Sequence, residues 1–313
     1  MARSTRLLPH SSLLTLYAVS LTCLLGQSTT APALAGAGYT SPFPILVAPG
    51  QLVTMYLQST AAPNVSAVYW TQQKQESMPV LQVSPWSSSC AFPPGSAIPG
   101  SGCVSGLAVT VQIPLDAYDS MIVAEPSSIA LLVNGVQSAY LGVQAQPDHV
   151  HIFTSCDTIV GGNSCAPLIL HANGQPVSYQ NPAAGGETLI AYATGLGQTN
   201  PPLATGVPAA QASPAVSTFN LDFNYRPNAL ATQPATVYPQ PNPPLYAGST
   251  QGFMGLYQIN FSVPATPVGL QPCSNLDFIA DGPVGGLVLS NLTISIGSIY
   301  SFDGAGICVT PGN

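Results

Sequence analysis

The chain alternates short apolar runs with polar turn residues, and this pattern predicts an almost entirely β protein. Val, Ile, Thr, Tyr and Leu dominate the runs, and Gly, Pro, Asn and Ser separate them, which is typical of strands joined by turns. With 32 prolines and 29 glycines, the chain leaves little room for long helices. We predict strands at 44–48, 51–58, 65–72, 79–84, 106–113, 121–124, 129–134, 136–144, 151–154, 167–171, 187–193, 217–223, 235–238, 255–263, 274–280, 286–297 and 306–310.

Two dipeptides mark tight hairpin turns. Asn134-Gly135 and Asn173-Gly174 each lie between two apolar runs, and Asn-Gly is favoured where both central residues of a turn need a positive φ.

The chain also contains a near-repeat of itself. The turn and apolar run at 49–57 reappear in pattern at 185–193, and the run at 106–114 reappears at 255–264 with one residue inserted. We therefore expect two tandem antiparallel β-sandwich (Ig-like) modules after a cleaved signal peptide. The predicted boundaries are 1–35 for the signal peptide, 36–147 for the first module, and 148–313 for the second, with an insert around 217–245.

The first residues have the pattern of an export signal. Two arginines precede a short apolar core at 13–26, and the small residues at 33–35 suit cleavage after Ala35, with Ser28 as an alternative. Cys23 is an alternative acceptor for a lipid anchor, although Thr22 precedes it where a smaller residue is usual. No later segment is a candidate membrane span.

The charge balance excludes two classes of partner. Only 5% of the residues are charged, and the four basic residues face eleven acidic ones. After cleavage only Lys74 and Arg226 remain basic, which leaves a formal charge of −9. Nucleic acids and anionic membranes need clustered basic residues, so neither is an expected partner.

Six cysteines remain in the mature chain, and an even number in an exported protein predicts disulfides. Pairing of sequence neighbours is the simplest arrangement, although the spacing leaves the connectivity open. The predicted pairs are Cys90 with Cys103, Cys156 with Cys165, and Cys273 with Cys308.

The second half resembles a known family. The segment 185–198 is similar to a GE-x-x-x-IYATGLG-x signature, and shorter matches lie before it and, in the family's order, after it. These matches identify the chain as similar to the secreted acidobacterial (Solibacter-type) uncharacterised C-terminal domain family. The resemblance implies a β-sandwich in an exported protein and implies no activity. The shorter matches are at 152–154, 181–183, 201–210, 246–248 and 255–264, whereas the insert at 217–245, Cys273 and Cys308 depart from the family pattern.

His149 and His151 form the best candidate for a metal site. In an extended segment their side chains point to the same face, and Asp157 and His171 could supply further ligands once the chain folds. The alternative is a solvated or hydrogen-bonded linker between the modules.

Aromatic residues are candidates for a carbohydrate site. We single out Trp86, Tyr225 and Arg226, because exposed rings stack on sugars. Tyr69 and Trp70 are neighbours in one strand, so one of them faces outward, and we expect Trp70 to be the core residue.

The motifs of catalysis and of cofactor binding are poorly represented. The glycines at 195 and 197 are not followed by the Lys and helix of a phosphate loop, so we expect them to serve a tight turn with a positive φ. The chain has no GxSxG or HExxH motif, and we expect neither enzymatic activity nor a cofactor.

These features together favour an exported, non-enzymatic protein of the secreted fraction or the cell surface, with a role in envelope structure, adhesion or self-assembly. Scarcity of charge leaves few residues to protect sheet edges, so self-association through edges, or pairing with other envelope proteins, is expected. A carbohydrate-binding module that recognises polysaccharide is the alternative function, and a secreted hydrolase is a more distant one.

Overall fold

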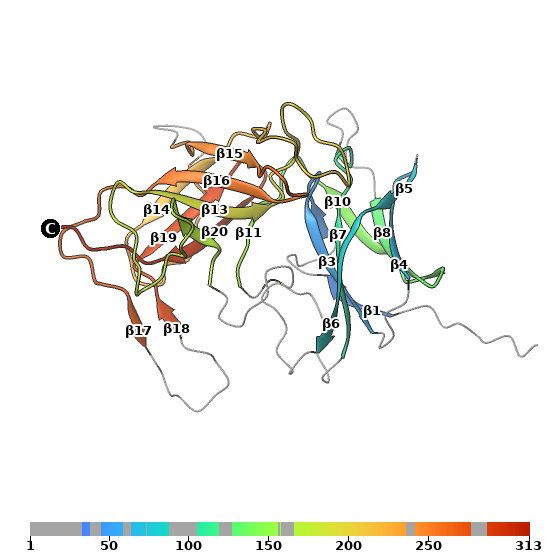
Figure 1. The fold of residues 1–313 in the computed structure, drawn as a ribbon, viewed down its shortest axis with the longest axis horizontal. Coiled ribbons are helices and arrows are strands. Elements are labelled where there is room, and N and C mark those ends of the chain that lie inside the picture. Colours follow the sequence, from blue (N-terminus) through green and yellow to red (C-terminus); the bar gives the residue numbers. More distant parts are fainter. Residues whose placement is uncertain are drawn as a thin grey trace, which may run out of the picture. The chain divides into compact units, whose positions relative to one another are not determined.

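The computed structural model consists of β-strands joined by turns and loops (Figure 1). The described part of the chain contains no helix, which confirms the all-β prediction. The structure describes residues 33–37, 45–58, 64–72, 74–87, 105–118, 127–155, 157, 166–235, 242–276 and 287–313.

The first half of the chain forms two sheets. The first has the order β1-β3-β7-β6, and every pairing in it is antiparallel. The second has the order β2-β10-β8-β4-β5, and β9 pairs with β8. The strands are β1 (Ala33–Ala37), β2 (Ile45–Val47), β3 (Leu52–Gln58), β4 (Val65–Trp70), β5 (Gln75–Met78), β6 (Val80–Ser87), β7 (Ser105–Gln112), β8 (Ser127–Val133), β9 (Val136–Gln137) and β10 (Leu141–Ala145).

Among the pairings between described strands, one departs from the antiparallel prediction. β2 runs parallel to β10, with Val143 opposite Ile45. The chain turns at Pro49-Gly50 and continues as β3 in the other sheet, so β2 cannot form a hairpin with its successor. It joins the edge of the second sheet beside the last strand of this half instead.

The second half also forms two main sheets. The larger has the order β11-β13-β16-β15 with β12 paired to β13, and the smaller has the order β14-β19-β20. β17 and β18 form a separate hairpin. The strands are β11 (His151–Ile152), β12 (Ile169–His171), β13 (Thr188–Thr194), β14 (Asn220–Asn224), β15 (Tyr246–Ser249), β16 (Tyr257–Ser262), β17 (Ser274–Leu276), β18 (Leu287–Leu289), β19 (Leu292–Gly297) and β20 (Phe302–Ile307).

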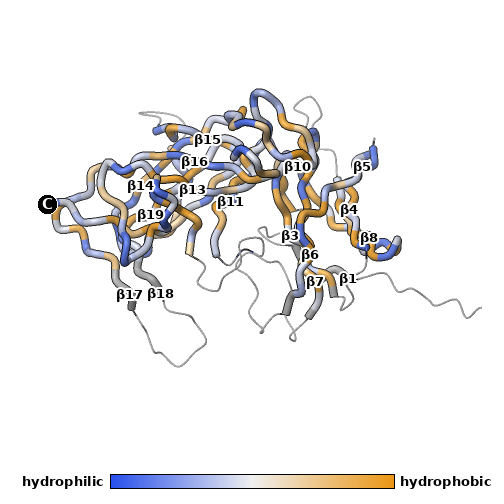
Figure 2. Tube along the Cα trace, viewed as in Figure 1, coloured by the Kyte–Doolittle hydropathy of each residue, from blue (hydrophilic) through white to orange (hydrophobic). Residues whose placement is uncertain are grey.

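Each half buries its own apolar face, as alternating side chains of a sandwich should. One hydrophobic cluster draws on residues between 45 and 143, and the other on residues between 150 and 309. Figure 2 shows apolar residues concentrated along the strands, with polar stretches in the loops. The module boundary at 147 and 148 stays a prediction, as does the status of 217–245 as an insert. β14 lies within that segment and contributes Leu221 to the second cluster.

Several elements differ from the predicted ones. β5 and β15 were not predicted, because Gln75–Met78 and Tyr246–Ser249 have weak apolar alternation and form strands only by pairing with stronger neighbours. The predicted strand at 286–297 is two strands, β18 and β19. The strand predicted at 121–124 falls outside the described residues, and so does the strand predicted at 235–238 except for residue 235, which is not in a strand. The turn at Asn134-Gly135 is confirmed, with φ values of 52° and 78°.

The predicted signal peptide lies outside the described residues up to position 32. Ala33–Ala37 form β1 and pair with β3. Cleavage after Ala35 would therefore cut through a strand, whereas cleavage after Ser28 would leave it whole.

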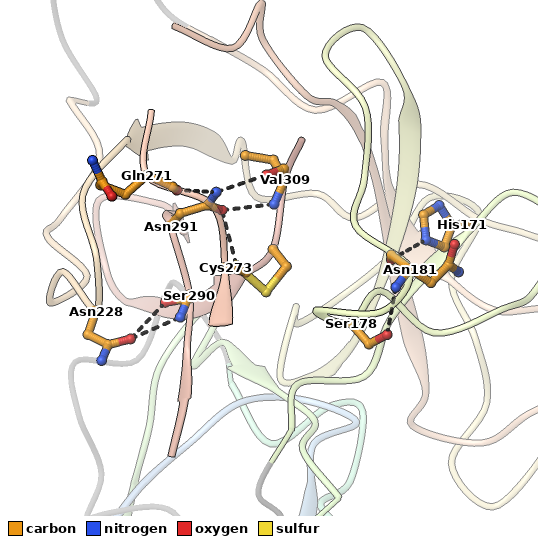
Figure 3. Close-up of a disulfide and its surroundings, with 10 residues drawn as sticks. His171, Ser178, Asn181, Asn228, Gln271, Cys273, Ser290, Asn291 and Val309 are labelled. Atoms are coloured by element: carbon orange, nitrogen blue, oxygen red, sulfur yellow. Dashed lines mark hydrogen bonds between the residues drawn. A yellow bond between two sulfur atoms is a disulfide. The ribbon is translucent and has the colours of Figure 1, made fainter. Parts of the chain in front are cut away.

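One predicted disulfide is present. Cys273 and Cys308 are bonded, with Cα atoms 5.6 Å apart, and the bond joins the segment before β17 to the end of β20. Beside it, the Asn291 amide donates to the carbonyls of Gln271 and Val309 at 2.9 and 2.8 Å and accepts from the Val309 amide at 2.8 Å (Figure 3). The other four predicted disulfide cysteines lie outside the described residues, namely Cys90, Cys103, Cys156 and Cys165.

The turn after β13 fits against the segment that precedes β11. Gly195 and Gly197 have φ values of 78° and 81°, which confirms the structural interpretation of these glycines. A Cβ on Gly195 would lie 1.9 Å from the His149 carbonyl oxygen, and one on Gly197 would lie 2.0 Å from the Pro147 oxygen. Only glycine therefore allows the backbones at 195–197 and 147–149 to approach this closely.

The end of β13 and the segment that follows the turn contact the first half of the chain. The Leu52 amide donates to the Thr194 hydroxyl at 2.8 Å, and the Leu115 amide donates to the Thr205 hydroxyl at 2.9 Å. Residues 31–313 belong to one compact unit, so these bonds lie inside a single body. We call this set of contacts the seam.

Replacing Gly195 tests the seam. Gly195→Ala adds a clash with the His149 carbonyl to the cost of a positive φ, so we expect the free energy of unfolding to fall by about 3 kcal/mol. Gly174→Ala is the matched control, because Gly174 has a φ of 82° and no atom within 4 Å of its would-be Cβ. We expect the control to lose about 1 kcal/mol in urea unfolding. Equal losses in the two variants would contradict the seam.

Candidate binding site at the β19–β20 turn

The turn between β19 and β20 presents three large apolar side chains to solvent. Ile299, Tyr300 and Phe302 are 63%, 50% and 41% exposed. Phe302 pairs with Gly297 across the hairpin, and a Cβ on Gly297 would lie 2.4 Å from the Phe302 Cβ. Glycine at that position therefore lets the two strands close tightly beneath the turn. We call residues 298–302 the hairpin tip.

A buried carboxylate holds the hairpin tip from below. Asp148 is fully buried, and its Oδ1 accepts hydrogen bonds from the hydroxyls of Ser298 and Ser301, both at 2.7 Å. The Ser301 hydroxyl oxygen accepts from the Val150 amide at 3.0 Å, and that of Ser298 accepts from the Tyr300 amide at 2.9 Å. These hydrogen bonds attach the turn to the segment before β11, while Asp148 Oδ2 is buried without a hydrogen-bond partner among the described residues.

His151, the first residue of β11, forms a second link to β20. Its Nε2 lies 3.1 Å from Asp157 Oδ2, and its Nδ1 lies 3.4 Å from Asp303 Oδ2. Burial disfavours the charged ring, but the hydrogen bonds and negative charges of Asp157 and Asp303 outweigh it and raise the pKa of His151 to about 9. The ring is therefore an imidazolium between two carboxylates at neutral pH.

His149 has the opposite electrostatic environment. Burial, together with the positive charge of His151, lowers the pKa of His149 to about 4, although Asp303 opposes the shift. Its Nδ1 lies 3.0 Å from the amide nitrogen of Gln51, which donates to it. The neutral ring thus links the segment to the first half of the chain.

These contacts give the predicted metal site no geometric support. His151 is held by Asp157 and Asp303. His171 is engaged elsewhere, with Nδ1 2.5 Å from Glu187 Oε1 and Nε2 3.1 Å from the Asn181 oxygen. Within the described ranges, no three His, Cys, Asp or Glu side chains are grouped as a metal site would require. Metal binding by His149 and His151 stays a prediction.

His171, the last residue of β12, contacts two points of the loop before β13. Glu187 accepts from the ring and also, at 2.9 Å, from the Ala184 amide, while the Asn181 carbonyl accepts from the other ring nitrogen. Hydrogen bonding lowers the pKa of Glu187, although burial opposes this. These hydrogen bonds therefore fix the loop before β13.

The predicted carbohydrate residues are scattered. Trp86 lies on β6, and its side chain is outside the description. Tyr225 packs against the second hydrophobic cluster and donates its hydroxyl to the Pro264 oxygen at 3.0 Å. Arg226 is exposed, and its Nε donates to Asn224 Oδ1 at 2.9 Å. A carbohydrate site at these residues stays a prediction.

Two features were missed in the sequence. The prediction of Trp70 as the core residue is wrong, because Tyr69 is fully buried and Trp70 is not. The hairpin tip fell in the gap between predicted strands, although its apolar residues between two serines are a signal that could have been used.

Comparisons with known proteins leave the family open. No family model matches the chain, and no curated protein matches it. Solved structures align only weakly. The C-terminal domain of the Streptococcus agalactiae AgI/II polypeptide BspA is 10% identical, with 90% of this chain and 99% of that chain covered and a TM-score of 0.19. The C-terminal domain of the Streptococcus pyogenes antigen I/II-family protein AspA is 10% identical, with 88% and 99% covered and a TM-score of 0.18. Such low TM-scores support no argument about function.

In the ranges that the structure describes, there is no helix of sufficient length and apolar character to cross a membrane.

The charge states of His149 and His151 predict two opposite effects of pH on the free energy of unfolding. His151 keeps its proton to about pH 9 in the folded state, so its stabilisation is complete below about pH 6.5 and is lost as the pH rises toward 9. His149 refuses a proton until about pH 4, so its stabilisation is complete above about pH 6.5 and is lost as the pH falls toward 4.

Urea unfolding from pH 4 to 9 measures both effects. Relative to the wild type, His151→Gln should flatten the alkaline limb and His149→Gln the acidic limb, each by roughly 2 kcal/mol. Each variant controls for the other, because further groups titrate equally in both. Identical pH profiles for the two variants would contradict the assigned charge states.

Removal of the Asp148 carboxylate should loosen the hairpin tip. Asp148→Ala deletes two hydrogen bonds to a charged acceptor, so we expect the free energy of unfolding to fall by about 3 kcal/mol. We also expect amide hydrogen exchange at 298–302 to accelerate more than in the β13–β16 pair. Unchanged exchange at the tip would show that Asp148 does not hold it.

Proposed function

We propose that this is an exported, non-enzymatic surface protein that attaches to a protein partner through the hairpin tip. The observation that carries the proposal is the exposure of Ile299, Tyr300 and Phe302 on a turn anchored by a buried carboxylate. The sequence left envelope structure, adhesion and self-assembly as roles, and the geometry favours adhesion over self-assembly.

Rigidity of the hairpin tip would favour binding. Large exposed side chains gain most when they enter a partner's pocket, and aromatic residues dominate the binding energy of protein interfaces. Ordering a flexible loop on binding costs free energy, which a turn fixed in advance avoids. Anchoring by Ser298 and Ser301 would therefore raise affinity without contacting the partner.

Charge narrows the kind of partner. The chain carries a formal charge of −7, and Asp303 on β20 follows directly after the tip. A neutral or basic groove on a partner protein complements such a surface, whereas an acidic one would be repelled.

Sheet edges are a weaker candidate for attachment. The edge strand β6 contains Pro85, which blocks a continuous ladder of hydrogen bonds. Beside the edge strand β5, Lys74 lies 2.9 Å from Glu76 and 2.5 Å from Asp116. Proline and charge both oppose edge-to-edge pairing, so these two edges are better protected than the low charge content suggested.

The side chains around the tip support a non-enzymatic role. His151 is charged and held between two carboxylates, and Asp148 is buried beneath serine hydroxyls. A general base needs an accessible lone pair. These groups position the turn instead.

Binding to cells tests the proposal. We would label the full-length protein with a fluorophore and titrate it onto cells of the organism that makes it. We expect saturable binding, and we expect the combined variant Ile299→Ser, Tyr300→Ser and Phe302→Ser to weaken it by about tenfold or more.

A matched control separates the tip from general apolar stickiness. Leu230, Leu245 and Val268 are 85%, 66% and 78% exposed and lie outside the tip, so their combined replacement by Ser should leave binding unchanged. Absence of saturable binding by the wild type would overturn the proposal, and so would equal losses in the two combined variants.

A further inference from the structure

The outer face of the sheet β2-β10-β8-β4-β5 carries two aromatic rings side by side. Trp70, at the end of β4, and Tyr140, just before β10, meet edge to face with ring centroids 4.9 Å apart and an interplanar angle of 63°. Tyr69 points into the core, so the alternation of the strand turns Trp70 to the opposite face. Tyr140 is 59% exposed, which leaves much of its ring open to solvent.

The register of the sheet places small polar residues beside the rings. Trp70 lies opposite Ser128 on β8 and opposite Gln75 on β5. Ser128 lies opposite Gly142 on β10, and a Cβ on Gly142 would meet no atom within 4 Å. The row thus combines an open notch with a hydroxyl and an amide that can donate and accept hydrogen bonds.

Among the described residues of β4, β5, β8 and β10, the one charged side chain, Glu76, belongs to the other face. Glu76 lies opposite Tyr69 and therefore shares its side of the sheet. Lys74 bonds to Glu76 and Asp116, and all three charges act on the Tyr69 hydroxyl. Among the described residues of the row beside Trp70, every side chain is uncharged.

We infer that Trp70 and Tyr140 form a binding site for a neutral oligosaccharide. The C–H groups on one face of a pyranose ring are apolar and slightly positive, and they are attracted to the negative face of an aromatic ring. Sugar hydroxyls both donate and accept, which matches Ser128 and Gln75. A proline-rich peptide would also stack on the rings, but its backbone offers these groups mainly acceptors.

This site is independent of the hairpin tip. It lies on the sheet of β4, β8 and β10, whereas the tip joins β19 to β20. Loss of either activity therefore leaves the other intact.

Tryptophan fluorescence of the chain can report sugar binding. The chain contains two tryptophans, so Trp86→Phe leaves Trp70 as the source of tryptophan fluorescence. We would titrate this variant with cellohexaose and mannohexaose, and with trigalacturonate as an anionic sugar. We expect a saturable change with at least one neutral sugar, and about tenfold weaker binding or none for the anionic one.

Two further variants locate the binding. Tyr140→Ala in the Trp86→Phe background should weaken the affinity about tenfold, and it removes a side chain that is mostly exposed, so folding should be preserved. Phe253→Ala is the control, because Phe253 is 56% exposed and lies outside this sheet. Isothermal titration calorimetry extends the test to Trp70→Ala, with circular dichroism as the check on folding.

Three results would overturn the inference. The first is no saturable change with either neutral sugar up to about 10 mM, a range in which weak sites still bind. The second is an equal loss of affinity in Tyr140→Ala and Phe253→Ala. The third is binding of decaproline without binding of the neutral sugars, which would assign the site to peptides.

Discussion

The structure depends on the close approach of two backbone segments, the turn at 195–197 and the linker at 147–151. The turn leaves no room for a side chain, because carbonyl oxygens of the linker occupy the space that a Cβ would need. Fixed in this way, the linker distributes its side chains among three parts of the protein. His149 reaches Gln51 in the first half, Asp148 reaches the hairpin tip, and His151 reaches Asp303 on β20.

The linker also carries three of the chain's few ionisable side chains. In a chain with 5% charged residues, a buried carboxylate, an imidazolium and a neutral imidazole lie within four consecutive residues. The two histidines hold different charge states because Asp157 and Asp303 both contact His151, whereas the effect of Asp303 on His149 does not offset the burial of that ring. These electrostatic contacts position the backbone of the hairpin tip, whose exposed side chains are apolar.

The sequence predicted the local features well and the long-range ones poorly. Asn134-Gly135 and the glycines at 195 and 197 were predictable, because a positive φ restricts the residue types that fit. The bond between Cys273 and Cys308 followed from their proximity in sequence. By contrast, His151 contacts Asp157 and Asp303, and Asp303 lies about 150 residues away in the sequence. No local sequence pattern indicates the contact with Asp303. Trp70 was misplaced for a related reason: two neighbouring aromatic residues fit either face, and only the pairing with β5 and β8 decides which one is buried.

The central claim is that the linker joins both halves and the hairpin tip into one rigid body. NMR relaxation of backbone ¹⁵N nuclei measures this directly. The account predicts one rotational correlation time for amides of both hydrophobic clusters and order parameters near about 0.85 for the tip amides. Two separate correlation times, or order parameters below about 0.6 at Ile299 and Tyr300, would contradict it.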